Sequence, residues 1–241
     1  MLIKVLFIAS LLLPAVSYSS SLEQEDIAVN NLIRSMVEDD ANTFLRHGKT
    51  VFFNGIGSYS SNEIIADYRS NELYANKKYL NKVLRITGKA SEIRADSSGN
   101  GIIEMGNAGY STGLRLHIDG DSEYAINLTK GAPVDVICVG GKLAHGVPVM
   151  QDCSSASEYT DILSNAYLSG LNKDPDTKAI FYSILKGNES ELYKPCLAGA
   201  KECLDAIQSL VREGINPWDK AEIYLRAHYP EVEKKHNPLF K

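Results

Sequence analysis

The sequence lacks most of the patterns that identify an enzyme or a cofactor-binding protein. It has no H-E-x-x-H motif, no glycine-rich phosphate loop and no Cys-x-x-Cys pair. The five histidines are scattered along the chain and follow no metal-ligand spacing. We therefore expect a protein that is not an enzyme, with no catalytic residues, no metal and no cofactor.

An excess of positive charge is also missing, as is any long apolar run beyond the first residues. The formal net charge of −5 argues against a protein whose whole surface binds nucleic acid or anionic lipid. A local basic face is still compatible with this charge. Because no later segment is apolar enough to cross a membrane, we expect no stable span after processing. The sequence does not indicate an oligomeric state.

The first residues have the layout of a secretory signal peptide, which we predict over residues 1–19. Lys4 supplies a positive charge, and Val5–Leu13 form an apolar run that is too short to span about 30 Å of hydrocarbon. Pro14 and a series of small residues follow. We therefore expect an exported protein that is periplasmic or secreted.

Four cysteines follow the predicted signal peptide, and export favours disulfide bonds between them. Four cysteines allow three pairings. Cys138 and Cys153 fall near the ends of two consecutive predicted strands, at a spacing that suits a bridge. Cys196 and Cys203 would lie about 10.5 Å apart on one straight helix, which is too far. A nearby proline and glycine, however, predict that Cys196 lies in the loop before the helix, which would permit a local bridge.

The apolar pattern predicts a chain that changes from mixed to helical. We expect helices over residues 22–45, 62–79, 157–171, 176–186, 199–213 and 217–227, and strands over 83–93, 101–105, 114–118, 134–139 and 147–150. This predicts an α+β fold, with a five-stranded OB-type Greek-key β-barrel preceded by helices and followed by a small helical C-terminal domain. The expected units are 1–19, 22–153 (helix plus barrel), 156–230 (helical domain) and 231–241 (tail).

The first and third predicted strands share a polar side. If their apolar residues face the barrel interior, the alternating residues point outward together. These candidate ligand-binding residues are Arg85, Thr87, Lys89, Arg115 and His117. OB-type barrels bind oligonucleotides or oligosaccharides on this face. An ordinary solvated face with alternating charge is the alternative interpretation.

Neighbouring residues both raise and lower the positive charge of this candidate face. Arg94 adds positive charge, whereas Glu92 and Glu104 reduce it. Proteins that bind single strands usually add aromatic platforms to the charge. Only Tyr110 and Tyr124, in predicted loops, are obvious candidates for that role.

Several short sequence patterns between residues 63 and 153 occur in the same order as in one family of bacterial proteins. They are Tyr68, Asn71, Ala75, Tyr79 and Lys82, then VLRITG from Val83, LTKG from Leu128 and the final Asp152-Cys153. This succession resembles the tRNA_anti-like family of bacterial OB-fold proteins. The resemblance implies the barrel and, by analogy with anticodon-binding barrels, nucleic-acid binding. The chain departs from lipoprotein members because no lipid-accepting cysteine is present near the predicted cleavage site.

Two functions are compatible with these patterns. The first is an exported, non-enzymatic binding protein that holds an oligonucleotide or another anionic polymer on the outward face of the first three strands. The alternative is an envelope protein-interaction or immunity-type adaptor that acts through the helical C-terminal domain. The partner would then be an envelope protein, and we would expect an exposed apolar patch on those helices.

Overall fold

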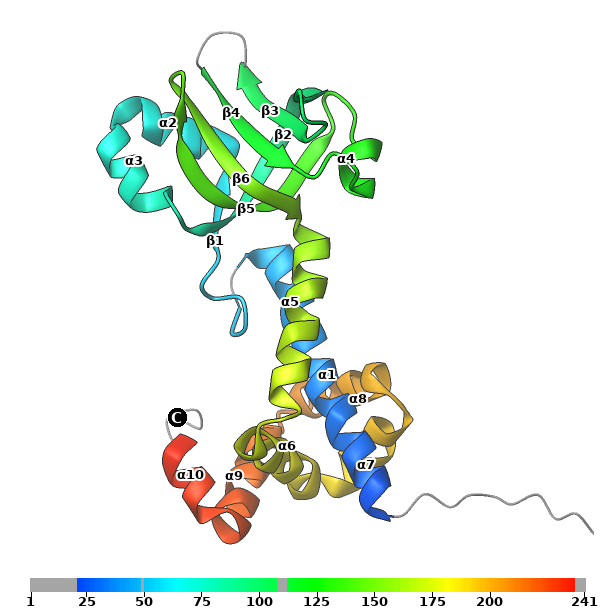
Figure 1. Ribbon diagram of the computed structural model, residues 1–241. Helices are drawn as coiled ribbons and strands as arrows, with labels where there is room; N and C mark the ends of the chain where they lie inside the picture. The colour runs from blue at the N-terminus through cyan, green and yellow to red at the C-terminus, as the bar shows by residue number, and fades with distance from the viewer. Residues whose placement is uncertain (1–20, 49, 108–111, 237–241) are drawn as a thin grey trace, which may run out of the picture.

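The computed structural model describes residues 21–48, 50–107 and 112–236. The predicted signal peptide and residues 237–241 of the predicted tail lie outside the described residues. Figure 1 shows three parts: a head that contains the β-sheet, a stalk of two long helices, and a helical body below. The head comprises β1–β6 and α2–α4, the stalk is α1 with α5, and the helical body is α6–α10 with the first half of α1.

The helices are α1 (Ser21–His47), α2 (Ser61–Ser70), α3 (Glu72–Tyr79), α4 (Glu123–Asn127), α5 (Ala156–Leu171), α6 (Pro175–Gly187), α7 (Glu189–Ala198), α8 (Ala200–Arg212), α9 (Pro217–His228) and α10 (Pro230–His236). The strands are β1 (Gly57–Ser60), β2 (Val83–Ala95), β3 (Gly101–Asn107), β4 (Thr112–Ile118), β5 (Pro133–Ala144) and β6 (Val147–Ser155). All five expected strands are present, and several are longer than the pattern predicts. The single helix expected over residues 62–79 is two helices, because Asn71 ends α2 and its side chain caps α3.

In the described part of the chain, the sheet has six strands in the order β1-β2-β3-β4-β6-β5. The long β2 pairs with β5 over its first half and with β3 over its second half, so that strands β2–β6 form a closed ring of pairings. β4 and β6 are parallel, and the other pairings within the ring are antiparallel. The expectation of five strands is therefore corrected. β1, in a segment expected to be a loop, adds to β2 in parallel through its backbone.

The interior of the head is filled by the inward side chains of the ring and by α2 and α3, which cover one end of it (Figure 1). Leu84, Ile86 and Leu116 are buried there, as their alternation predicts. Tyr79 is also buried in this core. The Cys138–Cys153 disulfide joins β5 to β6 at its edge.

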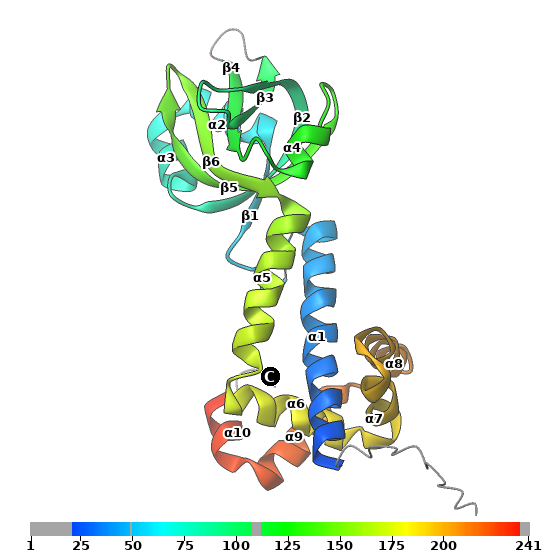
Figure 2. The ribbon, with the colours of Figure 1, turned by 45° about the vertical axis from the view of Figure 1, so that its right-hand side comes forward.

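The stalk connects the head to the helical body. α1 and α5 run side by side in opposite directions, as Figure 2 shows. A separate buried cluster forms where the stalk meets the sheet, and its members include Phe44, Phe53, Ile137 and Ala156. The Phe44 and Phe53 rings stack with their centroids 5.2 Å apart. The junction is therefore packed and apolar.

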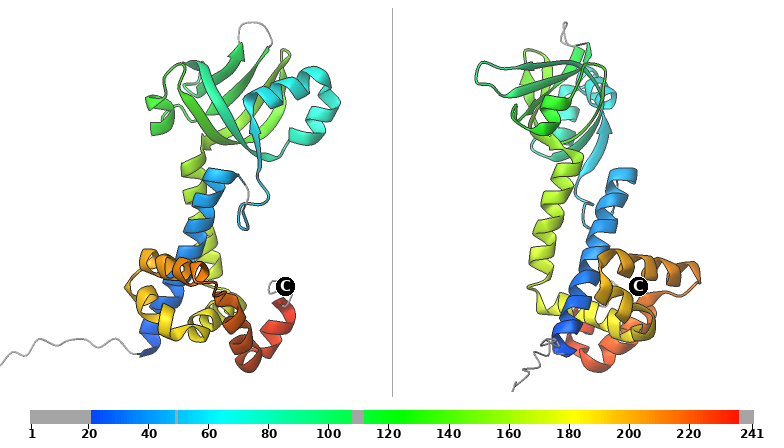
Figure 3. Two further views of the ribbon diagram at one scale, coloured as in Figure 1. Left: turned by 180° about the vertical axis from the view of Figure 1, so that it is seen from behind. Right: turned by 90° about the vertical axis from the view of Figure 1, so that its right-hand side faces the viewer.

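The helical body is built from both ends of the chain. Leu32 and Ile33 of α1 are buried among residues of α6, α7 and α8. Figure 3 shows the first half of α1 beside these helices. Cys196 and Cys203 form a disulfide, but Cys196 lies in α7 and not in the predicted loop. The helix breaks at Gly199, so the two cysteines come from consecutive helices. No helix in the described ranges is both long and apolar enough to cross a membrane.

Candidate functional site

The outward surface of β2, β3 and β4 forms an open polar face. Met105, Leu114 and Leu116 point into the core, so the residues between them point outward. The register aligns Glu92 with Glu104 and Glu104 with Arg115, and it aligns Arg94 with Ile102 and Ile102 with His117. We call this surface the strand face and define it by Lys89, Glu92, Arg94, Ile102, Glu104, Arg115 and His117.

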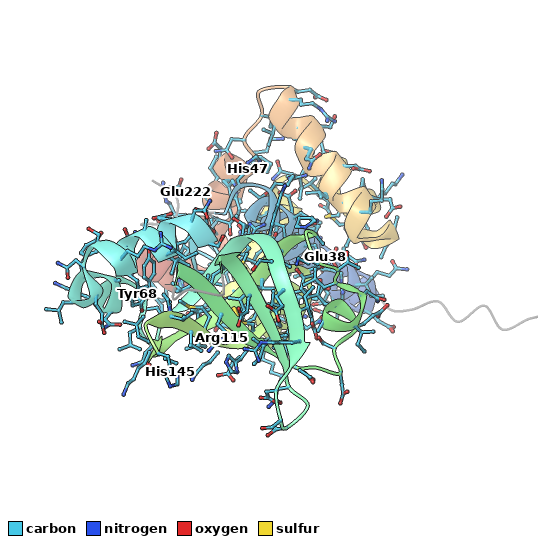
Figure 4. The ribbon with its side chains drawn as sticks, turned by 90° about the horizontal axis from the view of Figure 1, so that it is seen from above. Glu38, His47, Tyr68, Arg115, His145 and Glu222 are labelled. Carbon is cyan, nitrogen blue, oxygen red and sulfur yellow. A yellow bond between two sulfur atoms is a disulfide. The ribbon has the colours of Figure 1, made fainter. Side chains whose placement is uncertain are left out.

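A buried carboxylate organises two guanidinium groups on the strand face. Glu104 is only 6% exposed, and its Oε1 accepts hydrogen bonds from Arg94 Nη2 at 3.0 Å and Arg115 Nε at 3.2 Å. The arginine side chains themselves are 39% and 23% exposed. Each guanidinium carries five N–H donors, so both retain donors beyond those that bind Glu104. Figure 4, which views the molecule from above, labels Arg115 on the sheet.

The structure brings some of the predicted ligand-binding residues together and separates others. Arg115 and His117 lie side by side on β4, and Lys89 is exposed on β2 next to the row of Glu92. Thr87 is exposed but lies farther along β2, where that strand pairs with β1 and β5. In the turn beside His117, Asp96 accepts hydrogen bonds from the backbone N–H groups of Ser98 and Asn100 and from the Asn100 side chain. Those bonds, and the nearby histidine, lower the pKa of Asp96.

Arg85 is not accessible on the strand face, although the alternation of its strand correctly predicts that it points away from the core of the head. It is 7% exposed because the end of α1 covers it. Its Nε and Nη2 donate to the two carboxylate oxygens of Asp135 at 2.8 and 2.6 Å. Its Nη1 and Nη2 donate to the carbonyl oxygens of Phe44 and Leu45, both at 2.6 Å. Arg85 therefore joins the last turn of α1 to the sheet.

Tyr124 and Tyr110, the two tyrosines expected as platforms for base stacking, provide no such platform among the described residues. The ring of Tyr124 packs against the head core, its hydroxyl oxygen accepts a hydrogen bond from the Asp135 N–H at 3.1 Å, and burial raises its pKa. Tyr110 lies outside the described residues. The strand face, as defined above from described residues, carries no Phe, Tyr or Trp side chain.

The sequence does contain one catalytic pattern, between β3 and β4. Residues Gly109–Gly113 read GYSTG, which matches the G-x-S-x-G pattern of serine hydrolases. In those enzymes the serine stands in a turn from a strand to a helix. Here the flanking β3 and β4 pair with each other in antiparallel register, with Asn107 opposite Thr112. The surrounding elements are therefore not those of a nucleophile elbow.

Among the described residues, no cluster of three or more His, Cys, Asp or Glu side chains could hold a metal ion.

Comparisons with known proteins give a family and a distant structural neighbour. The family model described as tRNA_anti-like matches residues 1–154, which include α1 and nearly the whole head. No curated protein matches the chain significantly. A solved structure from Klebsiella pneumoniae, described as a candidate nucleic acid-binding lipoprotein, is 16% identical to it. That match covers 41% of this chain and 90% of the other, with a TM-score of 0.35.

Proposed function

The chain belongs to the tRNA_anti-like family, and we propose that it is an exported, non-enzymatic protein that binds single-stranded nucleic acid on the strand face. We also propose that its closed ring of strands is an OB-type Greek-key barrel. The pairing order β2-β3-β4-β6-β5, with β2 closing on β5, supports this assignment. OB-type barrels bind oligonucleotides and oligosaccharides around their second and third strands, which here are β3 and β4.

The observation that carries the proposal is the pair of arginines held by Glu104. A guanidinium whose orientation is fixed loses less entropy when it binds a phosphate, and its planar fork can donate two hydrogen bonds to one phosphate group. Guanidinium planes also stack on unpaired bases. Arg94 and Arg115 could therefore supply both charge and stacking on a face without a described aromatic platform.

The charge of the strand face sets the expected strength and specificity. Three cations, Lys89, Arg94 and Arg115, stand beside the carboxylates Glu92 and Glu104. This nearly balanced face can engage only a few phosphates, so we expect modest affinity. Contacts to phosphate and base faces carry little sequence information, so we expect weak sequence preference.

Fluorescence anisotropy with labelled oligodeoxythymidylate at several KCl concentrations tests the proposal. Two phosphate contacts predict a slope of about −1.4 for log K against log salt, because each contact on a single strand contributes about −0.7. Arg115→Ala should weaken binding and flatten the slope by about 0.7, and Arg94→Ala/Arg115→Ala should remove most of the binding. Lys201→Ala, which removes an exposed cation from α8, is the matched control and should change nothing.

Two results would contradict the proposal. Affinity of the double variant within about twofold of the native protein would exclude the two arginines as phosphate contacts. Binding that is independent of salt, or that neutral oligosaccharides compete away, would instead indicate a saccharide ligand for the same face.

The proposed export is supported by the two disulfides, since such bonds persist in oxidising compartments. Fractionation of cells that express the full chain should place it in the periplasm or the medium. Removal of residues 1–19 should retain it in the cytoplasm.

A second function, partner binding in the manner of an envelope or immunity-type adaptor, is supported by apolar residues exposed on the helical body. Val211 of α8 is 59% exposed and Ile223 of α9 is 71% exposed. A specific envelope partner should then co-purify with the native chain and be lost on Val211→Ser/Ile223→Ser. A partner that survives deletion of the residues after Ser157 would contradict this function.

A further inference from the structure

The helical body contains a large apolar cavity between α1, α6, α8 and α9. Its volume is about 1160 Å³, which is above the usual range for small-molecule pockets. Apolar side chains make up most of its wall, and they include Phe52, Ile180 and Trp218. A cavity of this size and composition suits a ligand with a large apolar body.

The residues that line the cavity show that it is elongated along two helices. They run from Met36 to Thr43 on α1 and from Leu204 to Arg212 on α8, at the spacing of one helical face. Because each residue of a helix adds about 1.5 Å, the cavity extends about 10.5 Å along α1 and about 12 Å along α8. This shape suits an extended hydrocarbon chain better than a compact ring system.

Two buried polar atoms in the wall have no hydrogen-bond partner within the described residues. They are Thr50 Oγ1 and His236 Nε2, the second of which lies 3.5 Å from Asp176 Oδ2. Buried polar atoms in folded proteins are nearly always hydrogen-bonded. Their position in this wall therefore indicates a ligand that carries polar groups as well as an apolar body.

The loop that carries Thr50 is fixed to the neighbouring helices. Asp40 Oδ1 and Oδ2 accept hydrogen bonds from the Val51 and Phe52 N–H groups at 3.0 and 2.9 Å. The Phe52 carbonyl accepts another from the Tyr167 hydroxyl of α5 at 2.7 Å. This side of the cavity is therefore preformed, which lowers the entropy cost of binding a ligand.

Two oppositely charged residues of the wall are available to a ligand. Asp39 of α1 and Arg212 of α8 line the cavity, and neither forms an ion pair within the described residues. Together they complement a head group that carries both an anion and a cation. A head with a carboxylate alone would complement Arg212 but would share the cavity with the like charges of Asp39 and Asp40.

We propose that the cavity of the helical body binds a single-chain zwitterionic lipid. Its acyl chain lies among the apolar side chains, and its phosphate and ammonium groups face Arg212 and Asp39. One elongated cavity accounts for the single chain, and the pair of opposite charges accounts for the head. This assignment does not depend on what the strand face binds.

Titration of the full chain with dodecylphosphocholine, below its micelle concentration, tests the proposal. Trp218 is the only tryptophan in the chain and lies in the cavity wall, so its fluorescence reports binding at this site. We expect a saturable change. Affinity should fall about fourfold for each methylene removed from the alkyl chain, since every buried methylene contributes a similar transfer free energy.

Two exposed apolar residues of the helical body provide a matched pair of variants. Val211→Glu places a charge in the cavity wall and should weaken binding about tenfold. Ile223→Glu places the same charge on α9, outside the wall, and should bind like the native chain. Circular dichroism checks that both variants retain their helices.

Four amphiphiles with the same alkyl chain length test the head group. Dodecylphosphocholine should bind more tightly than dodecanoate, dodecyltrimethylammonium and dodecyl maltoside. Arg212→Ala should weaken the phosphocholine about fivefold without weakening the trimethylammonium compound. Asp39→Asn should also weaken the phosphocholine about fivefold, without weakening dodecanoate.

Other outcomes would overturn the proposal. Binding seen only above the micelle concentration, or affinity that does not change with chain length, would exclude an acyl chain in the cavity. Equal affinity for all four heads would exclude the zwitterionic head. A dimer that sediments as one species and dissociates on addition of the amphiphile would instead make the cavity an interface between two copies of the chain.

Discussion

Arg85→Ala should destabilise the junction between α1 and the sheet without acting on a ligand. The substitution removes four hydrogen bonds from a side chain that is only 9% exposed. Breaking a buried ion pair costs about 3–5 kcal/mol. Two features favour the lower end of this energy range. Asp135 is 42% exposed and can bind water in the variant. The Phe44 carbonyl also still accepts a hydrogen bond from the Gly48 N–H. We therefore expect a loss of about 3 kcal/mol.

Urea titration followed by circular dichroism measures this loss. With an m-value of about 3 kcal/mol/M, the unfolding midpoint of Arg85→Ala should fall by about 1 M. Arg85→Lys should lose about 2 kcal/mol, because an ammonium cannot reproduce the fork that contacts Asp135 and two carbonyls at once. Lys89→Ala is the matched control: it removes an exposed cation from the same side of the same strand and should stay within about 0.5 kcal/mol of the native protein.

The reasoning is refuted if Arg85→Ala unfolds at the same urea concentration as Lys89→Ala. The oligonucleotide assay gives an independent check, since Arg85→Ala should retain the native affinity. If Arg85→Ala were fully stable and lost oligonucleotide binding, Arg85 would be a ligand-binding residue, as the alternation of its strand first predicts.

Two further substitutions test other contacts. The hydrogen bond from Lys186 lowers the pKa of Glu25 from its ordinary value of 4.5. The ionised Glu25 therefore stabilises the folded chain at pH values above 4.5. This stabilisation is lost as the pH falls through the lowered pKa of the folded state. Glu25→Gln should therefore unfold at lower urea than the native chain at pH 7, and the difference should shrink as the pH falls below 4.5. A difference that is constant with pH would contradict this. A Cβ at Gly140 would collide with the carbonyl oxygen of Tyr79, so Gly140→Ala should cost about 1–3 kcal/mol in thermal unfolding, whereas Gly55→Ala, which has open space, should not. Equal melting temperatures for the two alanine variants would exclude the collision.

The sequence predicts those parts of the fold that depend on local periodicity. Alternation in β2 and β4 places Leu84, Ile86 and Leu116 in the core, because side chains on a strand alternate between two faces. β1 is missed because Gly57–Ser60 has no apolar alternation, and only its backbone pairing with β2 makes it a strand. α7 and α10 are missed for a similar reason: proline and short length obscure the helical pattern.

The candidate site is predicted only in part, for a different physical reason. The alternation of side chains along β2 and β4 correctly predicts that Arg85 and Arg115 point away from the core of the head, but it does not predict which element covers them. The end of α1 covers Arg85, whereas Arg115 stays open beside Glu104. Chain order also assigns α1 to the barrel, although Leu32 and Ile33 pack with the C-terminal helices. Amphipathic helices bury an apolar face without encoding which partner covers it.

The position of α1 determines how the strand face and the helical body can communicate. α1 is tied to the sheet by Arg85 at its last turn and to α6 by Glu25, whose contact with Lys186 Nζ is 2.7 Å, at its first turns. The middle of α1, with Met36, lines an apolar cavity between α1, α6, α8 and α9 of the helical body. A ligand confined to the strand face would contact neither end of α1, so it would have no differential contact through which to shift that helix. An occupant of the cavity, in contrast, would contact α1 directly at Met36. Any coupling between the strand face and the helical body must therefore pass through a displacement of α1. The Arg85 hydrogen bonds at one end of α1 and the Glu25–Lys186 ion pair at the other end oppose such a displacement.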